Sequence, residues 1–215
     1  MNILGIDTSS KKLDIAITDG KDIFLNISLE GKERTSKNIV SSLKGLLDLE
    51  GIDISFVQGI SVVKGPGSFT GLKIGMTLAK VLSYINNIPL IGVDLFEVIV
   101  YNYSFLNTGM EILIPSRRDE FYWARYDKCE KMPIRYKVIR KEMFKEELNR
   151  EFWIYVPFKE LKTEFVGWGF QNIIPGWYFQ NKAFISAILG REKLINGQSD
   201  DPYTIEPLYI RKFPF

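Results

Sequence analysis

Residues 60–93 read ISVVKGPGSFTGLKIGMTLAKVLSYINNIPLIGV, and this stretch decides the fold. Its first four residues are a compact apolar run, which predicts a buried strand. A glycine-rich loop at Gly65–Gly71 follows, and apolar residues at helical spacing then predict a helix from about Leu72 to Asn86. Asn87-Ile88-Pro89 ends the helix, and Leu90 to Val93 predicts another strand. A strand, a helix and a strand joined by such short segments predict a right-handed crossover between two parallel strands.

Upstream of this unit the sequence predicts three strands and a helix. Asn2 to Asp7 is apolar on both faces, so we expect it to be central in a sheet. Leu13 to Thr18 alternates apolar residues, and Asp19-Gly20 is a hairpin signal before a third strand at Asp22 to Ser28. The chain therefore opens with an antiparallel meander. An amphipathic helix that ends near Gly51 follows, with apolar residues at Ile39, Val40, Leu43, Leu46 and Leu47.

Beyond Asp94 the sequence becomes richer in aromatic residues and in alternating stretches, which places a domain boundary near residue 100. We expect an N-terminal domain over 1–100 and a second, smaller α/β domain over 101–215, with the last residues able to return to the first. The second domain is expected to hold a charged helix at Lys141–Arg150 and strands at Phe121–Tyr126, Ile134–Ile139, Phe152–Val156 and Phe165–Trp168.

The composition is that of a folded globular protein, and it excludes several kinds of catalytic site. Among 215 residues, 46% are hydrophobic and 25% are charged, with a formal net charge of only +2. That charge is too small to indicate nucleic-acid binding unaided. The chain contains no histidine, which excludes a Ser-His-Asp triad, a Cys-His pair and an H-E-x-x-H zinc site. Its one cysteine, Cys129, allows no intramolecular disulfide and is expected to be structural.

The N-terminus and the hydropathy pattern predict a cytoplasmic protein that does not bind membranes. Met1 to Asp7 lacks a basic segment and reaches an acidic residue after six positions, so it does not resemble a signal peptide. No apolar run reaches the ~18 residues that a membrane span requires.

The turn after the first strand, Ile6-Asp7-Thr8-Ser9-Ser10, combines an acid with three hydroxyl groups. In actin-like and sugar-kinase-like ATPases the corresponding turn holds nucleotide phosphates, and its Asp orients a Mg²⁺-bound water. This turn contains no glycine, which makes close approach of a phosphate to its backbone less assured. The alternative is an Asx or Ser/Thr turn that satisfies its own backbone.

The loop Gly65–Gly71 does not fit the common phosphate-binding motifs. Gly65 and Gly71 are one residue too far apart for a Walker A loop, and Leu72-Lys73 follows where that motif needs Lys and Ser or Thr. Gly65, Gly67 and Gly71 are nearer to a dinucleotide fingerprint. Pro66 removes one N–H from the loop and Phe69 is bulky, so a dinucleotide site is the weaker interpretation.

Three further groups of charged or aromatic residues each have a structural explanation. Arg117-Arg118-Asp119-Glu120 can contact phosphate, but adjacent opposite charges are more typical of a solvated turn. The charges from Arg140 to Lys145 are typical of a solvated helix face. The aromatic rings of Trp168, Trp177, Tyr178 and Phe179 can stack on bases, and core packing explains them at least as well.

The helix predicted at about Leu72 to Asn86 is apolar on more than one face. Met76, Ala79 and Leu82 share one side, and a second set lies on another side, formed by Ile74, Leu78, Val81 and Ile85. Burial within its own domain and contact with a partner are both open, because helical patterning does not distinguish them.

Several segments together resemble the TsaB (YeaZ) family. They are Ile3 to Ser10, the long string Lys64-Gly65-Pro66-Gly67-Ser68-Phe69-Thr70-Gly71-Leu72-Lys73-Ile74-Gly75, and the shorter segments Ile88–Asp94, Ser116–Tyr122 and Pro207–Arg211. In the family's D-A-R-R-x-E segment, Pro115-Ser116 replaces Asp-Ala here. The match is strong over residues 1–100 and thin between 127 and 205.

The resemblance implies an α/β fold of the ASKHA type (actin-like, Hsp70-like, sugar-kinase-like), with two small βαβ-containing lobes. It also implies a role in forming N6-threonylcarbamoyladenosine (t6A37) in ANN-decoding tRNAs, as a non-catalytic partner or scaffold of TsaD. TsaD-like catalysts hold their metal with an H-x-x-x-H pair, which a chain without histidine does not supply. The resemblance further implies the ATPase TsaE as a partner, a homodimer when the chain is alone, indirect contact with tRNA, and no cofactor or metal of its own.

In this family the dimers pack through the two N-terminal helices. The resemblance therefore implies a shared helical contact formed by Ile39, Leu43, Leu46, Ile74, Leu78 and Val81. It also implies a vestigial phosphate loop made of Asp7, Thr8, Ser9, Gly65, Gly67, Ser68 and Gly71, with no catalytic residue.

Two other functions compete with the scaffold. One is an ATP-binding phosphotransferase or ATPase of the ASKHA class that uses Asp7 to Ser10 and Gly65 to Gly71. The other is a peptidase that acts on TsaD, which the absence of histidine disfavours, although a Ser-Lys dyad is formally open.

Overall fold

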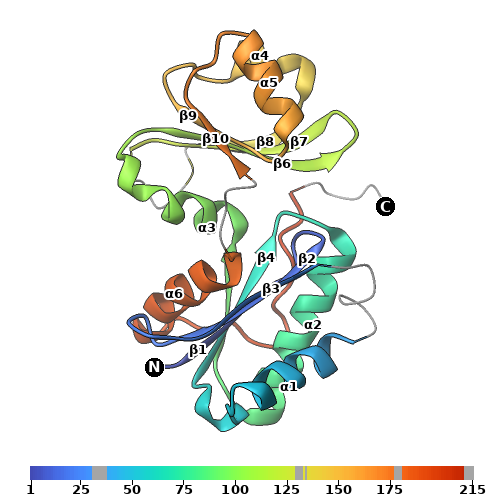
Figure 1. The fold of residues 1–215 in the computed structure, drawn as a ribbon, viewed down its shortest axis with the longest axis vertical. Coiled ribbons are helices and arrows are strands. Elements are labelled where there is room, and N and C mark those ends of the chain that lie inside the picture. Colours follow the sequence, from blue (N-terminus) through green and yellow to red (C-terminus); the bar gives the residue numbers. More distant parts are fainter. Residues whose placement is uncertain (31–37, 129–132, 134, 177–180, 211–215) are drawn as a thin grey trace. The chain divides into compact units, whose positions relative to one another are not determined.

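A computed structural model describes residues 1–30, 38–128, 133, 135–176 and 181–210 (Figure 1). The chain forms two compact units. The first contains Met1–Val98 and returns with Asn181–Leu208, and the second contains the described residues of the stretch 99–180 together with Tyr209 and Ile210. Residues 181–208, which lie within the stretch 101–215, therefore pack in the first unit.

The first unit is built on a five-stranded sheet with the order β3-β2-β1-β4-β5. Its strands are β1 (Ile3–Asp7), β2 (Lys12–Thr18), β3 (Ile23–Glu30), β4 (Gly59–Gly65) and β5 (Leu90–Asp94). β1, β2 and β3 form the expected antiparallel meander. β1, β4 and β5 are parallel, which confirms the crossover predicted from residues 60–93.

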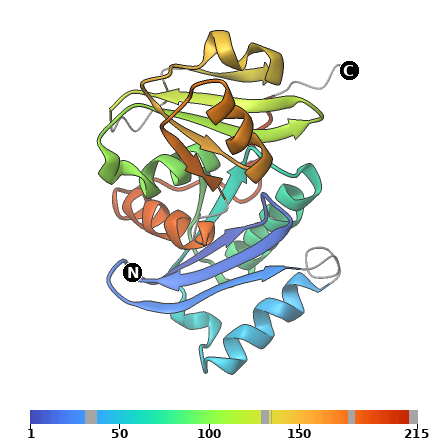
Figure 2. The same ribbon diagram turned by 45° about the horizontal axis from the view of Figure 1, so that its top comes forward.

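One face of the sheet carries large apolar side chains, and the other mixes apolar side chains with small and polar ones. Leu4, Ile6, Ile15 and Val62 belong to one buried cluster with residues of α1 (Ile39–Leu49) and α2 (Phe69–Asn86). α6 (Lys182–Ile195) packs on the opposite face, as Figure 2 shows. A short 3-10 turn, η1 (Ile54–Phe56), follows α1.

Small residues let α6 lie close to the sheet. A Cβ on Gly5 would stand 2.0 Å from the backbone oxygen of Ala183, and a Cβ on Gly190 would stand 2.5 Å from the Ser61 side chain. The Ser61 hydroxyl donates to the Ser186 carbonyl at 2.7 Å. Because no large side chain fits between them, this face of the sheet is specific for α6.

The second unit repeats the strand order of the first. Its sheet runs β10-β9-β6-β7-β8, with β6, β7 and β8 antiparallel and β6, β9 and β10 parallel. Its elements are β6 (Met110–Arg117), β7 (Glu120–Tyr126), β8 (Arg135–Arg140), η3 (Lys141–Met143), α4 (Phe144–Glu147), β9 (Trp153–Val156), α5 (Lys159–Gly167) and β10 (Ile173–Pro175). α3 (Leu95–Asn102) and η2 (Ser104–Leu106) lie between the two sheets in the sequence.

Two local predictions for the second half of the chain were wrong. Phe165 to Trp168 was expected to be a strand, but Phe165 lies inside α5 and Trp168 directly follows it. The Phe165 ring is fully buried and packs on Phe144 and Phe170, so tertiary packing of aromatic residues decides the helix. The helix expected at Lys141–Arg150 is shorter, because α4 ends at Glu147. Cys129, Trp177, Tyr178 and Phe179 lie outside the described residues.

Candidate functional site

The residues predicted to form a phosphate loop do come together, at the end of β1. The turn Asp7-Thr8-Ser9 packs against the loop Gly65–Gly71 that begins α2. The Thr8 hydroxyl donates to the Gly71 carbonyl at 2.8 Å, and the Ser68 backbone N–H donates to the Ser9 carbonyl at 2.7 Å. The Ser68 hydroxyl accepts from the Gly71 N–H at 3.3 Å and caps α2.

The Asp7 carboxyl is completely buried. Its Oδ1 accepts from the Ser9 backbone N–H at 2.8 Å, while Oδ2 lies 3.7 Å from the Lys182 ammonium of α6. Burial raises the pKa of Asp7, the Lys182 charge lowers it in part, and the nearby Asp14 carboxylate raises it again. Asp7 thus faces an internal cation and has no access to solvent.

The space beside the glycines of the loop is occupied by backbone and side-chain atoms of Thr8 and Ser9. A Cβ on Gly67 would stand 2.4 Å from the Ser9 carbonyl oxygen, and a Cβ on Gly71 would stand 2.1 Å from the Thr8 carbonyl oxygen. A Cβ on Gly75, further along α2, would stand 2.2 Å from the Thr8 hydroxyl oxygen. The glycines therefore allow the turn after β1 to touch the start of α2 directly.

This geometry does not favour the ATPase alternative. A phosphate bound by backbone N–H groups needs free donors and space beside them. Here the Ser68 N–H is used by Ser9, and the positions next to the glycines are filled by Thr8 and Ser9. The turn and the loop act as a packed joint between β1 and α2.

A second charged group lies at the carboxyl ends of β4 and β5, and the sequence did not single it out. The Lys64 ammonium stands 3.2 Å from Asp94, and the Lys193 ammonium stands 2.7 Å from Glu97. Burial raises the pKa of Asp94, and the Lys64 charge opposes that shift. Close by, the Asp200 carboxylate accepts a hydrogen bond from the Gly92 N–H at 2.7 Å. This hydrogen bond ties the segment after α6 to β5 of the sheet.

The six residues expected at a helical partner contact divide between core and surface. Ile39, Leu43 and Leu78 are buried in the core of the first unit, Leu46 and Ile74 are partly buried, and Val81 is 46% exposed. Besides Val81, the large hydrophobic side chains that α1 and α2 expose are Val40, Leu49, Phe69, Tyr84 and Ile85. We define the α1–α2 surface as five of these exposed residues: Val40, Leu49, Val81, Tyr84 and Ile85.

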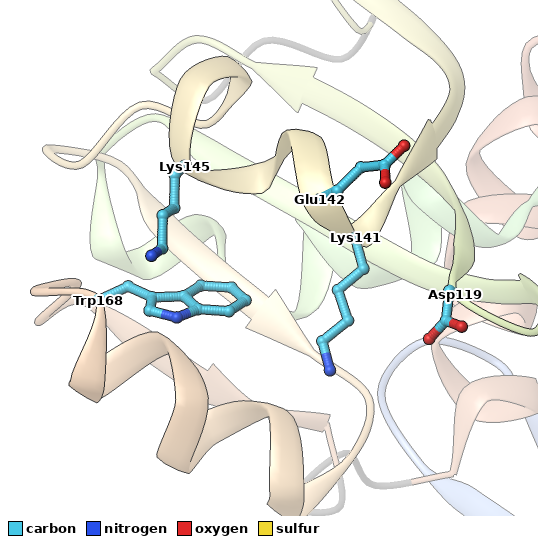
Figure 3. Close-up of a pocket in the computed structure, with 5 residues that line it drawn as sticks. All are labelled: Asp119, Lys141, Glu142, Lys145 and Trp168. Carbon is cyan, nitrogen blue, oxygen red and sulfur yellow. The ribbon is translucent and has the colours of Figure 1, made fainter.

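A pocket of about 440 Å³ lies in the second unit (Figure 3). Its lining comes from the β6–β7 turn, η3, α4 and the residue after α5, and it comprises Asp119, Lys141, Glu142, Lys145 and Trp168. Figure 3 shows the Lys145 ammonium above the Trp168 indole, and these two groups are 5.2 Å apart from ammonium to ring centroid. Arg117-Arg118-Asp119-Glu120 forms the β6–β7 turn, as expected.

Glu111 is a buried carboxylate of the second unit that sequence reasoning missed. It accepts hydrogen bonds from the Trp123 indole at 2.5 Å, the Arg125 guanidinium at 2.9 Å and the Asn149 N–H at 2.8 Å. Burial raises the pKa of Glu111, and these three donors oppose the shift. With its acceptor capacity used inside the unit, Glu111 joins β6, β7 and the segment before β9.

Within the described part of the chain, no group of three or more Asp, Glu, Cys or His side chains is arranged to hold a metal ion. None of the described helices combines the length and the apolar character needed to cross a membrane.

Comparison with known families identifies the chain. A sequence model of the family described as "TsaD: tRNA N6-adenosine threonylcarbamoyltransferase" matches residues 30–147, more than half of the 215 residues. The chain belongs to this family. The residues matched run from the end of β3 to the end of α4, and so include α1, the glycine loop and α2.

Curated relatives of the family confirm the resemblance to TsaB. The chain is 29% identical over 132 residues to the Escherichia coli tRNA threonylcarbamoyladenosine biosynthesis protein TsaB, covering 60% of this chain and 57% of that protein. It is 33% identical over 126 residues to the Bacillus subtilis protein of the same name, covering 59% and 55%. The chain thus spans a little over half the length of these relatives.

Solved structures confirm the fold over nearly the whole chain. YeaZ from Pseudomonas aeruginosa superposes with a TM-score of 0.75 at 18% identity, covering 97% of this chain and 99% of that one. A Bacteroides thetaiotaomicron protein with an actin-like ATPase fold gives a TM-score of 0.53 at 8% identity, covering 87% and 95%. The α/β fold of ASKHA type with two βαβ-containing lobes is therefore confirmed.

Proposed function

We propose that this chain is a non-catalytic subunit that acts with a TsaD-type protein in forming t6A37 in ANN-decoding tRNAs. The observation that carries the proposal is the similarity to TsaB proteins over about 60% of the chain, together with the match of residues 30–147 to the TsaD family model. The packed joint at Asp7–Ser9 supports a role without nucleotide chemistry at that place. The absence of histidine supports a division of labour in which the partner holds the metal.

The α1–α2 surface is the proposed contact with the TsaD-type protein. Ile85 is 71% exposed and Val81 lies one helical turn before it, so both offer apolar area that water now covers. Burying such side chains is worth about 1.5–3 kcal/mol each before the costs of association. Ile39, Leu43 and Leu78, which were expected at this contact, are buried in the core of the first unit, where they hold α1 and α2 on the sheet.

Further parts of the assembly follow from the same proposal. A TsaE-type ATPase joins the complex, and the chain contacts tRNA indirectly, through the complex. When no partner is present, the chain forms a homodimer through the α1–α2 surface. The proposal places this assembly in the cytoplasm.

Reconstitution tests the catalytic part of the proposal. The purified chain, a TsaD-type protein, a TsaE-type protein, threonylcarbamoyl-adenylate and an ANN-decoding tRNA should together yield t6A, measured by mass spectrometry of digested tRNA. The chain alone should yield none. Equal t6A formation without this chain would contradict the proposal, and so would modification by the chain alone.

Matched variants test the surface. Ile85→Glu and Val81→Glu should prevent co-elution with the TsaD-type protein while the circular dichroism spectrum stays unchanged. Ile195→Glu on α6 and Val166→Glu on α5 are the controls, because their side chains are also exposed, at 55% and 58%, and lie outside the surface. Loss of binding in the control variants as well would show that added charge, and not the surface, decides the result.

A further inference from the structure

Three groups of residues that the α1–α2 surface does not use meet in the second unit. They are the turn Arg117–Glu120, the charged stretch Arg140–Lys145 and the lone aromatic residue Trp168, and the sequence between them covers some fifty positions. Together they supply every residue that lines the pocket in Figure 3. Its volume of about 440 Å³ lies within the ~300–1,000 Å³ of typical small-molecule sites.

Lys145 differs from the other cations around this pocket. The Lys141 ammonium donates to Glu164 at 2.6 Å, and Arg140 stands 3.6 Å from Glu142. Among the described residues, none of the ion pairs involves Lys145. Its ammonium instead lies over the Trp168 ring, a contact that orients the charge without neutralising it. The pocket therefore presents a positive charge suited to an anionic group.

Trp168 supplies a flat apolar surface next to that charge. The Phe165 ring packs against Trp168 at a centroid distance of 5.4 Å, and Phe165 itself is completely buried. The indole is therefore supported from the core while it lines the pocket. A supported aromatic ring beside a cation is the combination on which nucleobases stack in single-strand binding proteins.

Asp119 and Glu142 add hydrogen-bond acceptors to the same pocket. Both carboxylates are exposed, at 69% and 70%, and their partners Arg118 and Arg140 stand 3.6 Å away. Exposed pairs of this length are worth little, so both carboxylates can accept from a ligand instead. Carboxylates select bases that present an exocyclic amine, as Glu and Asp do with the N4 amine of cytosine.

We propose that this pocket binds a nucleotide whose base carries an exocyclic amine, with the phosphate at Lys145, the base against Trp168 and the amine toward Asp119 or Glu142. The ligand is either a free mononucleotide or one nucleotide of a single-stranded RNA, because both present the same groups. The site lies entirely within the second unit and needs no TsaD-type partner. A negative result for this proposal therefore would not contradict the proposed function.

Calorimetric titration of the full chain tests the proposal with defined probes. Adenosine monophosphate and cytidine monophosphate should bind more tightly than uridine monophosphate, whose base has no exocyclic amine, and than ribose 5-phosphate, which has no base. A single-stranded hexaadenylate RNA is the second arm. Tighter binding of the RNA than of adenosine monophosphate identifies the strand as the ligand, and the reverse identifies the free nucleotide.

Three variants connect any binding to this pocket. Lys145→Gln should weaken binding of adenosine monophosphate about tenfold, the loss expected for one charge-assisted contact. Trp168→Leu should weaken it as well, whereas Trp168→Phe, which keeps a flat ring, should retain most of the affinity. Lys162→Gln is the matched control, because Lys162 is an exposed lysine of α5 that does not line the pocket.

Three results would overturn the proposal. They are no binding of adenosine monophosphate or hexaadenylate by the wild-type chain, equal affinity for ribose 5-phosphate and adenosine monophosphate, and unchanged affinity in Lys145→Gln. Should Trp168→Leu fail to fold, Lys145→Gln decides alone, since Lys145 forms no ion pair among the described residues and its loss leaves the core intact.

Discussion

Among single side chains, the buried pair of Asp7 and Lys182 makes stability depend on pH. Because burial raises the folded-state pKa of Asp7, the folded protein keeps this proton at pH values where the unfolded chain has lost it. The free energy of unfolding should therefore fall as pH rises from about 4 through the folded-state pKa. Asp7→Asn should remove this part of the decline, as measured by urea denaturation in steps between pH 4 and 8.

Lys182→Met tests the other member of the pair. The Lys182 charge lowers the pKa of Asp7, so its loss should raise that pKa further and leave a buried carboxylate without a cation at neutral pH. We expect a loss of about 3 kcal/mol at pH 7 and a smaller loss near pH 4. Lys11→Met, at an exposed position of the turn before β2, is the control and should change little. An equal loss at both pH values would show that the charge of Asp7 is not involved.

The glycines at the joint between β1 and α2 should tolerate no side chain. Gly71→Ala would place a methyl group 2.1 Å from the Thr8 carbonyl oxygen, so we expect a loss of about 2 kcal/mol or more in the free energy of unfolding. Gly45→Ala in α1 meets nothing within 4 Å and should stabilise the helix by about 1 kcal/mol. Urea denaturation of both variants gives the comparison, and a neutral Gly71→Ala would show that the joint is not tightly packed.

At the scale of a helix, an added charge should destabilise the protein when it is placed on the buried face of α2 and should change its stability little when it is placed on the exposed face. Leu78 is 4% exposed and packs in the core, so Leu78→Glu buries an unpaired carboxylate and should unfold the first unit. Ile85→Glu on the exposed face should change the free energy of unfolding by about 0.5 kcal/mol or less. Thermal unfolding distinguishes the two, and a stable Leu78→Glu would show that Leu78 is accessible.

The sequence predicted the elements whose apolar residues are large and regularly spaced. β1, β2, β3, α1, β4, α2 and β5 all lie where their patterns place them, within a few residues. α6 was missed because four of its five buried residues are small: Ala183, Ser186, Ala187 and Gly190 carry little hydrophobic signal, and only Ile185 is a large apolar residue. Their size suits a close approach to Gly5 and Ser61, which is a tertiary fact that no local pattern contains.

The candidate sites show the same limit. The family resemblance placed Asp7–Ser9 and Gly65–Gly71 in one loop site, and in the structure these two segments are hydrogen-bonded to each other. Which apolar residues of α1 and α2 face the core could not be predicted, since both faces of α2 are apolar. The pocket beside Trp168 was not predicted either, because its residues come from the β6–β7 turn, η3, α4 and the residue after α5, which only the folded second unit brings together.

For the chain as a whole, the two sheets share one strand order although the sequence shows no internal repeat. In each unit the first strand pairs antiparallel with the second and parallel with the fourth. Each unit thus has its own sheet and core, and each combines two separate segments of the chain. The first unit takes α6 and the residues up to Leu208 from the far end of the sequence.

This division predicts that residues 1–98 do not fold alone. Without residues 181–208, one face of the first sheet is uncovered and Asp7 loses its ion pair with Lys182. The hydrogen bonds from Ser61 to Ser186 and from Gly92 to Asp200 are lost as well. A fragment of residues 1–98 should therefore show no cooperative thermal transition by circular dichroism. A chain in which a Gly/Ser linker joins 1–98 to 181–208 should regain it, because the missing helix is restored.

The matched control for this pair uses the same linker joined to 181–208 with Gly190→Leu. A leucine there cannot fit against Ser61, since even a Cβ would lie 2.5 Å from its side chain, so the cooperative transition should be lost again. Folding of 1–98 without any added segment would show that α6 is accessory. Equal recovery with Gly190→Leu would show that the close packing of α6 on the sheet does not stabilise the unit, and that the added residues act merely by extending the chain.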